Sequence, residues 1–456
     1  MRFRERFFRY GAVLVFLFGS GCRYGAERLD LRESELTIRQ VDYEKSIYYL
    51  PGDPCPHLDS SRVRHDVIVE KKHRAIFIEN RFIRVILLPE MGRIYSLVNK
   101  TTGHDVFWRN DIVTVGDAVN PAGWWIWIGG MEFTLPGDEH GTTWAERWQY
   151  EIIENSDIIK TVRMKVREPL TGLREEVDVS LVAAASRLEI GVRILNPTAQ
   201  TVSYAHWVNP QWAPGGHNEL TDNTEFIIPT RRVLIPERFR ANLGESPQEW
   251  CTSRLRFIKG WTSGWGDLMA EKLEAGFYAA YSHDEEEGVV RVFDPEINPG
   301  VDAWTYGYHP RGNAAIPMGS GAYNNGYVEI WGGTSRLFPD ERHPLGPGET
   351  IGWTEWIYPF QSTGGLTLAA RDLAFHLIRK KESRSIFLAL DSSRVFKKAR
   401  CRLCAAGSTL LERSCDLSPD RPLCWTIEDR LPDKALKFEV WHHGEKLIEY
   451  SAAAVN

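Results

Sequence analysis

The sequence predicts an all-β protein, with a large β-sandwich followed by a small one. Short runs of alternating apolar and polar residues fill most of the chain, and Gly, Pro, Asn and Asp separate them. No long segment has the apolar period of a helix. The 456 residues are enough for one large β-domain and a smaller one. We expect a signal peptide at 1–22, a tether at 23–60, and sandwiches at 61–368 and 369–456.

The first 22 residues are typical of a bacterial export signal. Arginines near the start are followed by the apolar run GAVLVFLF at 11–18, and then by small residues before Cys22. We expect lipid attachment at Cys22, although Gly19 stands where a lipobox usually has Leu. Cleavage without lipidation and retention as an anchor are the alternatives. The protein is therefore expected outside the cytoplasm, in the periplasm or at the cell surface, with the lipid anchor as its membrane contact.

The polar, proline-bearing stretch up to residue 60 predicts the tether. Strands are expected next at 65–71 (HDVIVEK), 74–79 (RAIFIE) and 82–88 (FIRVILL), followed by the turn PEMG and a further strand. Regular turns between short strands favour an antiparallel arrangement.

Residues 112–145 differ from the strands around them. This segment is dense in Gly, alternates poorly, and gathers Trp with Glu132 and His140. A loop-rich segment of this kind is a candidate binding wall, because loops on a rigid scaffold often carry function. A meander of strands follows from 148 to 208, and the acidic run 284–287 is predicted to be a solvated hairpin turn.

Beyond Cys22 the chain has six cysteines, four of them between 401 and 424. An export compartment permits disulfides, so one or two are expected near the C-terminus. Cys401 and Cys404 form a CxxC pair, but Cys415 and Cys424 lack that spacing, which disfavours a zinc ribbon. We therefore expect no metal.

Composition excludes some partners. The formal net charge is −6, without the basic footprint of a nucleic-acid-binding protein. The sequence has no phosphate-binding or dinucleotide-binding motif, so no cofactor is expected. Seventeen Trp residues are a high count, and they either fill β-cores or stack on flat ligand faces.

The stretch GAYNNGYVEIWGG at 321–333 holds the most informative acid. Glu329 lies inside an apolar, aromatic run that is predicted to be a short buried strand. An ionised carboxylate is costly to bury unless it is paired or hydrogen-bonded. Glu329 is therefore either a structural acid paired with a cation such as Arg93, or a functional acid.

Several separated strings together resemble a known family. They are FIENRFIRVILLPEMGRIYSLVNKTTGHDVFWRND, GGMEFTLPGDEHG, YAHWVNP, NNGYVEIWGG and HPLGPGETIGWTEWIYPF. In this order they resemble a bacterial family of the galactose-mutarotase-like fold, the domain of unknown function 5107, over roughly residues 65–365. The resemblance implies a β-supersandwich of two large antiparallel sheets with a sugar-binding cleft.

The resemblance also implies site residues. Aldose 1-epimerases of this fold use a His as general acid and a Glu as general base, and the matching positions here are His206 and Glu329. The HGxxR loop of those enzymes is matched only by His140-Gly141, without its Arg at the expected place. His140 and Glu132 are further catalytic candidates, and Glu132 facing Glu329 would suit glycosidase chemistry.

Aromatic residues and one cation complete the expected cleft. Extended backbone would place Trp125 and Trp127 on one face. The expected substrate-binding residues are Arg93, Trp124, Trp125, Trp127, Trp304 and Tyr306.

The leading hypothesis is an exported carbohydrate-active protein that binds a sugar or oligosaccharide in an aromatic cleft and uses Glu and His for epimerisation, hydrolysis or elimination. A non-catalytic glycan-binding lipoprotein is the alternative, and a structural envelope protein with core aromatics is the third. Fold alone does not choose among them.

Overall fold

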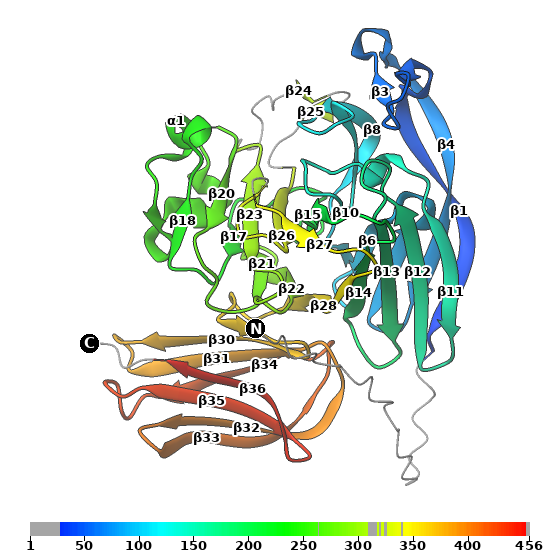
Figure 1. Cartoon of the computed structure of the whole chain (residues 1–456). Coiled ribbons are helices and arrows are strands. Elements are labelled where there is room, and N and C mark those ends of the chain that lie inside the picture. Colours follow the sequence, from blue (N-terminus) through cyan, green and yellow to red (C-terminus); the bar gives the residue numbers. More distant parts are fainter. Residues whose placement is uncertain are drawn as a thin grey trace, which may run out of the picture.

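The computed structural model describes residues 28–262, 264–308, 317–318, 321–322, 326–338 and 341–452. These residues form an all-β protein in which the helices are single turns, so the predicted fold class is confirmed (Figure 1). The helical turns are α1 (Arg240–Leu243), η1 (Glu44–Ser46), η2 (Ser60–Arg62), η3 (Pro89–Met91), η4 (Thr143–Ala145), η5 (Glu237–Phe239), η6 (Trp250–Thr252), η7 (Arg254–Arg256) and η8 (Ile258–Gly260).

The larger sheet carries the candidate site and has 14 strands in the described part of the chain. Its spatial order is β19 (Gln248–Glu249), β18 (Arg232–Leu234), β20 (Gly266–Ala270), β23 (Gly300–Thr305), β26 (Val328–Gly333), β16 (Trp207–Trp212), β10 (Met131–Thr134), β6 (Arg93–Asn99), β5 (Ile83–Leu88), β4 (Arg64–Glu79), β1 (Asp30–Asp42), β8 (Arg109–Asp117) and β9 (Trp124–Gly129), with β7 (His104–Asp105) beside β6. The pairings are antiparallel except for one parallel contact between β1 and β8.

The second sheet has eight strands and covers one face of the first. Its order is β11 (Gln149–Asn155), β12 (Ile159–Arg167), β13 (Arg174–Val182), β14 (Leu188–Leu195), β28 (Thr350–Gln361), β22 (Glu287–Val292), β21 (Phe277–Ser282) and β17 (Thr224–Ile227). Small two-stranded pairs are β15 (Val202–Tyr204) with β27 (His343–Leu345), β2 (Ile47–Tyr48) with β3 (His57–Leu58), and β24 (Pro317–Met318) with β25 (Gly321–Ala322).

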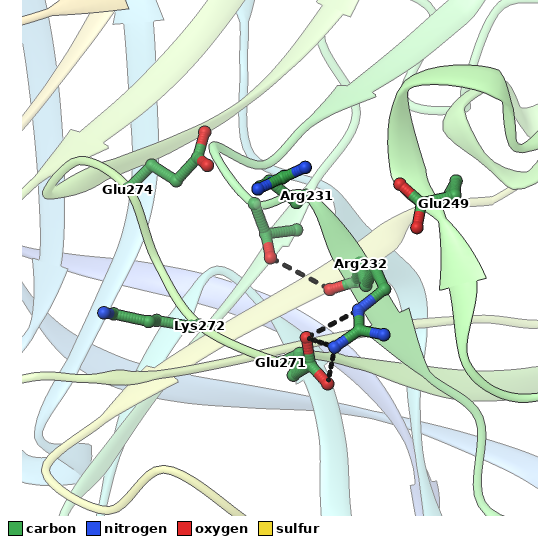
Figure 2. A pocket seen from close by; sticks show the side chains of 7 residues that line it. Arg231, Arg232, Glu249, Glu271, Lys272 and Glu274 are labelled. Atoms are coloured by element: carbon green, nitrogen blue, oxygen red, sulfur yellow. Dashed lines mark hydrogen bonds and ion pairs between the residues drawn. The ribbon is translucent and has the colours of Figure 1, made fainter.

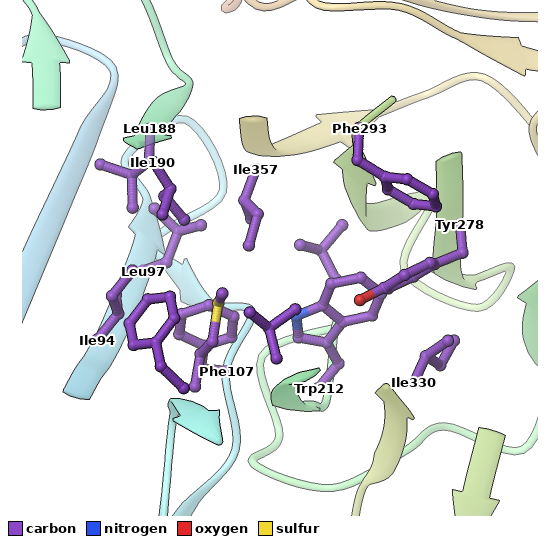
Figure 3. Packing of buried hydrophobic residues seen from close by; sticks show 14 of the residues in the cluster. Ile94, Leu97, Phe107, Leu188, Ile190, Trp212, Tyr278, Phe293, Ile330 and Ile357 are labelled. Carbon is purple, nitrogen blue, oxygen red and sulfur yellow. The ribbon is translucent and has the colours of Figure 1, made fainter. Parts of the chain in front are cut away.

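The main core fills the space between the two large sheets. Ile94, Trp212 and Ile330 come from the larger sheet, and Ile190 and Ile357 meet them from the second (Figure 3). Each of these side chains is buried, which stabilises the fold by about 1.5–3 kcal/mol per large aliphatic side chain. Because strand residues alternate between faces, the positions between these core residues lie on the opposite face of the larger sheet.

The predicted tether is wrong for much of its length. Residues 30–42 form β1, which pairs along its whole length with β4 and adds a strand to the larger sheet. The two strands predicted at 65–71 and 74–79 are also one continuous strand, β4. Much of the β1–β4 ribbon is exposed on both faces, so apolar alternation is weak there and the sequence pattern does not reveal the pairing.

The predicted loop-rich wall at 112–145 contains strands as well as loops. β9 and β10 are fully buried along their length, and Gly129 and Gly130 join them with positive φ of 98° and 77°. A Cβ at Gly130 would lie 2.4 Å from the carbonyl oxygen of Ile94, so only glycine permits this close approach. The sequence pattern did not reveal these strands, because their buried aromatic residues do not alternate with polar ones.

The C-terminal region forms a separate small sandwich, drawn in orange and red below the large one in Figure 1. One sheet contains β29 (Leu368–Ala369), β30 (Leu373–Lys380), β31 (Ser385–Ser392) and β34 (Leu423–Glu428), and the other β33 (Ser408–Leu417), β32 (Phe396–Ala405), β35 (Leu436–His442) and β36 (Glu445–Ala452). Phe375, Leu388, Leu403 and Phe438 are in the core between them.

The expected C-terminal disulfides are not present among the described residues, where all six cysteines are free. Cys404 and Cys415 are half-buried, and Cys424 is exposed on a different sheet. In the strand pairing Cys401 lies opposite Arg413, Cys404 opposite Thr409 and Cys415 opposite Ala399, so none of these three cysteines lies directly opposite another.

The predicted signal sequence and Cys22 lie outside the described residues. Within the described ranges, no helix combines the length and apolar character needed to cross a bilayer. Export and lipidation therefore stay predictions.

Candidate functional site

Glu329 lies near the middle of the larger sheet, on β26 between β16 and β23. Its side chain is only 5% exposed and points away from the main core, since its neighbours Val328 and Ile330 are core residues. Gln211 Nε2 donates to Glu329 Oε1 at 2.8 Å, and Trp331 Nε1 donates to Oε2 at 2.8 Å. Glu329 therefore has neutral hydrogen-bond donors, and the alternative of an ion pair with Arg93 is not what the structure shows.

A second buried acid lies on the same face, two strands away. Glu132 on β10 forms an ion pair with Arg93 Nη2 at 2.5 Å and contacts His140 Nδ1 at 2.5 Å. Arg93 also donates to the carbonyl oxygen of Gly129 at 2.8 Å, and Asn209 Nδ2 donates to Glu132 Oε1 at 3.3 Å. Glu132 thus links the sheet to the loop that carries His140.

Burial and charge have opposite effects on the pKa values of Glu132 and His140. Burial disfavours the Glu132 carboxylate, but His140 and Arg93 outweigh it and lower the pKa of Glu132 to about 2. Burial also disfavours the imidazolium, but the Glu132 carboxylate raises the pKa of His140 above its ordinary value. Burial raises the pKa of Glu329, and the nearby His140 opposes that rise. These surroundings thus favour the protonated form of His140 and the neutral form of Glu329 more than water does.

The backbone of His140 adopts an uncommon conformation. Its φ is 60°, in the left-handed region where non-glycine residues are uncommon and where strain often marks functional positions. The imidazole stacks on Trp125 with centroids 3.8 Å apart and planes 7° apart, and it lies 5.2 Å from the Trp331 ring. Because Trp331 also donates to Glu329, one indole contacts both candidate catalytic groups.

The structure places His206 elsewhere, contrary to the expectation that it pairs with Glu329. His206 is fully buried, with Nε2 2.8 Å from Glu175 Oε1 of the second sheet and its ring 5.1 Å from Trp353. It precedes β16, and the two-residue period puts 206 on the same side as the core residues Val208 and Trp212. Asn209 and Gln211 take the positions that face Glu132 and Glu329.

Some of the predicted aromatic residues lie at the site, and others make structural contacts. Trp125 and Trp127 do share a face, with ring centroids 6.2 Å apart, but only Trp125 contacts His140. Trp124 faces away and donates to the carbonyl oxygen of Pro56 at 2.8 Å, which is a structural contact. Trp304 and Tyr306 are half-buried and lie at right angles with centroids 4.1 Å apart.

Sequence reasoning missed four polar residues on this face: Asn209, Gln211, Asp267 and Asp302. Asp302 lies opposite Trp331, and Asp267 lies opposite Trp304, which itself pairs with Glu329. Residues opposite each other in antiparallel strands point to the same side. The signal was present, because Asp302 alternates with Val301 and Ala303 in VDAW as Glu329 does in VEIW.

Two hollows of the surface lie away from this site. A cavity of about 310 Å³ is lined by Thr230, Arg231, Arg232, Glu249, Glu271, Lys272 and Glu274, where Arg232 pairs with Glu271 (Figure 2). One of about 240 Å³ adjoins Asn80 and Lys100. Glu132, His140 and Glu329 are each 3–5% exposed, so the expected open cleft is a closed site in this conformation. Among the described residues, no group of three or more His, Cys, Asp or Glu side chains is placed to hold a metal ion.

Similar solved structures share parts of this architecture. A TPR-domain containing protein from Parabacteroides distasonis is 22% identical over 73% of this chain, with a TM-score of 0.60, and 55% of its own length is covered. A putative aldose 1-epimerase from Klebsiella pneumoniae is 11% identical, with 72% of this chain and 91% of that one covered and a TM-score of 0.46. A galactose mutarotase-like protein from Lactobacillus casei is 11% identical, with 62% and 99% covered and a TM-score of 0.42. This chain thus spans about half the length of the Parabacteroides protein.

Two family models match separate parts of the chain. The YphG-like protein, second domain, matches residues 369–450, which form the small C-terminal sandwich. The domain of unknown function (DUF5107) matches residues 62–356, which include most of both large sheets, but not β1, and every site residue described above. The chain therefore belongs to the DUF5107 family, as its separated sequence strings predict.

Proposed function

We propose that this protein binds a carbohydrate over the polar face of the larger sheet, with His140 and Glu329 as an acid–base pair at the anomeric carbon. The observation that carries the proposal is the contact of Trp331 with both groups, His140 being oriented by Glu132 and stacked on Trp125. The family resemblance in the sequence adds support for a carbohydrate. The half-buried pair Trp304 and Tyr306 supplies aromatic surface for a sugar ring.

In the proposed reaction Glu329 acts as the base and His140 as the acid. The Glu329 carboxylate accepts the proton of the anomeric hydroxyl, while the bond between C1 and the ring oxygen breaks and the ring oxygen takes a proton from the His140 imidazolium. Rotation about C1–C2 and closure on the other face return both protons, so the net reaction is epimerisation at C1. Such general acid–base catalysis typically contributes 10²–10⁴-fold.

Glu132 fits a positioning role in this scheme. A carboxylate whose pKa is lowered to about 2 is ionised at neutral pH and has no proton to donate. This disfavours a glycosidase mechanism in which Glu132 is the general acid, because that role needs a raised pKa. Arg93, which was expected to contact substrate, is instead engaged with Glu132 and Gly129.

Glu329→Gln tests the proposal. Mutarotation of α-D-glucose and α-D-galactose, followed by polarimetry, should be accelerated by the wild type and lose at least about 100-fold of that acceleration in the variant. Sugar affinity measured by calorimetry should change little, since Gln keeps the shape of the side chain. Glu151→Gln, on the exposed edge strand β11, is the matched control and should behave as wild type.

A non-catalytic glycan-binding function is the second candidate. Glu132 is paired with both Arg93 and His140, as in a purely structural cluster, and this pairing favours a site without acid–base chemistry. Calorimetric binding of a sugar without any acceleration of mutarotation would select this candidate. If neither sugar binds the wild type, the proposed site is wrong.

We also propose that the protein is exported and lipid-anchored through Cys22, on the basis of its N-terminal sequence. Wild-type protein expressed in a bacterium should fractionate with membranes, and Cys22→Ser should shift it to the soluble periplasmic or extracellular fraction. Equal fractionation of both forms would contradict lipidation at Cys22.

A further inference from the structure

The polar face continues past Glu329 onto β23 and β20. Asp302 and Asp267 are 4% and 5% exposed and point to the same side as Glu329, as the register with Trp331 and Trp304 requires. We call the side chains Arg93, Glu132, Asn209, Gln211, Glu329, Asp302 and Asp267 the polar row. They come from six neighbouring strands, β6, β10, β16, β26, β23 and β20.

Several acceptors in the polar row have no partner. Asp302 Oδ1, Asp267 Oδ1, Gln211 Oε1 and Asn209 Oδ1 are buried without a hydrogen bond in the described structure. An unsatisfied buried polar atom costs about 1–3 kcal/mol, so four on one face form a substantial local penalty. Acceptors gathered in this way suit a ligand that brings several hydroxyl donors.

The charge of the polar row also restricts the class of ligand that can bind. Asp267 has one cation beside it, Arg238, at 3.2 Å and largely exposed, and no ion pair of Asp302 occurs in the described structure. Burial raises the pKa of both acids, to about 6 for Asp267, and the neighbouring Asp267 carboxylate raises the pKa of Asp302 further. A phosphate or carboxylate on the ligand would add like charge to this end of the row. A neutral, hydroxyl-rich ligand fits it.

The length of the row indicates the ligand's size. From Glu132 on β10 to Asp267 on β20 there are four strand steps, or about 19 Å at about 4.8 Å per step. This exceeds a single pyranose ring. Trp304 lies opposite both Glu329 and Asp267, which places an aromatic surface between the two ends.

Resting on the function proposed above, we infer that Asp302 and Asp267 form a second sugar subsite, and that the protein binds a neutral disaccharide or longer glycan whose anomeric end lies at Glu329 and His140. The second sugar contacts Asp302, Asp267 and the Trp304 indole.

Calorimetry on the full chain tests the second subsite. The probes are D-glucose and D-galactose, the disaccharides maltose, cellobiose and lactose, and glucose 6-phosphate. At least one disaccharide should bind wild type at least 10-fold tighter than its constituent monosaccharides, and glucose 6-phosphate should bind no tighter than glucose. Asp302→Ala should remove the disaccharide advantage and leave monosaccharide affinity within about 2-fold.

Two further variants keep the result interpretable. Asp302→Asn retains an acceptor and the shape of the side chain, so it should keep part of the disaccharide advantage. It replaces Asp302→Ala in the test if the alanine variant does not fold. Asp284→Asn removes one acid from the exposed turn after β21 and should match wild type. Loss of mono- and disaccharide affinity to the same extent in Asp302→Asn would overturn the inference.

The outcomes separate the two proposals. Monosaccharide binding with no disaccharide advantage, or tighter binding of glucose 6-phosphate than of glucose, overturns the second subsite and leaves the proposed function standing. If no sugar in the panel binds wild type, both fail. A disaccharide advantage that disappears in Asp302→Ala, but not in Asp284→Asn, supports the second subsite.

Discussion

The two faces of the larger sheet each hold a buried histidine paired with a buried glutamate, yet the pairs differ in what surrounds them. On the outer face, His140 contacts Glu132 at 2.5 Å, with Arg93, Trp125 and Trp331 beside them. On the core face, His206 contacts Glu175 at 2.8 Å. There the surroundings are apolar, and the pair bridges the two large sheets.

The difference shows how one interaction serves two purposes. The His206–Glu175 pair joins two polar side chains inside a core, and His206 Nδ1 and Glu175 Oε2 have no hydrogen bond among the described residues. The His140–Glu132 pair belongs to a network that reaches Glu329 through Trp331 and continues into the polar row. The variants below separate these two pairs.

The largest expected effect comes from removing Glu132. Glu132→Ala leaves the buried Arg93 without a counter-charge and His140 without its hydrogen-bond partner, which should lower the free energy of unfolding by about 3–5 kcal/mol. Urea unfolding monitored by tryptophan fluorescence measures this loss. Glu175→Ala, the corresponding change in the core pair, should cost less, about 1–3 kcal/mol, because it removes a hydrogen bond to His206 and no ion pair with an arginine. Equal losses would show that the two pairs are energetically alike.

The pH dependence of stability should also distinguish the pairs. The folded-state pKa of Glu132, about 2, lies below its ordinary value of 4.5, so its stabilisation is fully present above pH 4.5 and is lost as the pH falls toward 2. A pKa lowered from 4.5 to about 2 corresponds to about 3 kcal/mol. Urea unfolding at several pH values between 7 and 2.5 should therefore show a steeper acid loss in wild type than in Glu132→Gln. If the unfolding free energies of wild type and Glu132→Gln fall in parallel with pH, the Glu132 carboxylate does not stabilise the fold in this way.

A smaller free-energy effect is expected when the histidines are exchanged for glutamine. His140→Gln should lower the mutarotation rate about 100-fold, or about 2.7 kcal/mol at the transition state, because the ring oxygen loses its proton donor. His206→Gln should retain the wild-type rate per folded molecule, even if it unfolds at a lower temperature. Polarimetry with the folded fraction measured by circular dichroism compares them. A greater loss of rate in His206→Gln would reverse our assignment.

Much of the larger fold could be predicted because its strands obey local rules. β5, β13 and β14 alternate or form apolar runs, and their turns carry Gly, Pro and Asn. The prediction was wrong at β1, where an exposed ribbon has no apolar pattern, and incomplete at β9 and β10, which are buried on both faces. Local pattern reports which faces are buried, and it is uninformative where both faces are exposed or both are buried.

The site could be predicted only in part for a related reason. Glu329, Glu132 and His140 were identifiable because acids and a histidine stand in apolar, glycine-rich surroundings. His206 has the same local appearance, but the register of β16 turns it into the core and brings Asn209 and Gln211 to the site. Asp302 and Asp267 were missed because β23 comes to lie beside β26, and β20 beside β23, only in the folded sheet.

The all-β class, the family and two of the buried acids, Glu329 and Glu132, could be predicted from the amino-acid sequence, because alternation and composition are local properties. Which acids lie together on one face depends on the tertiary structure. Strand order places β20, β23, β26, β16, β10 and β6 side by side, and register then aligns one polar residue after another on the face opposite the core. Strand order and register depend on contacts between residues far apart in the chain, so no short stretch of sequence contains them.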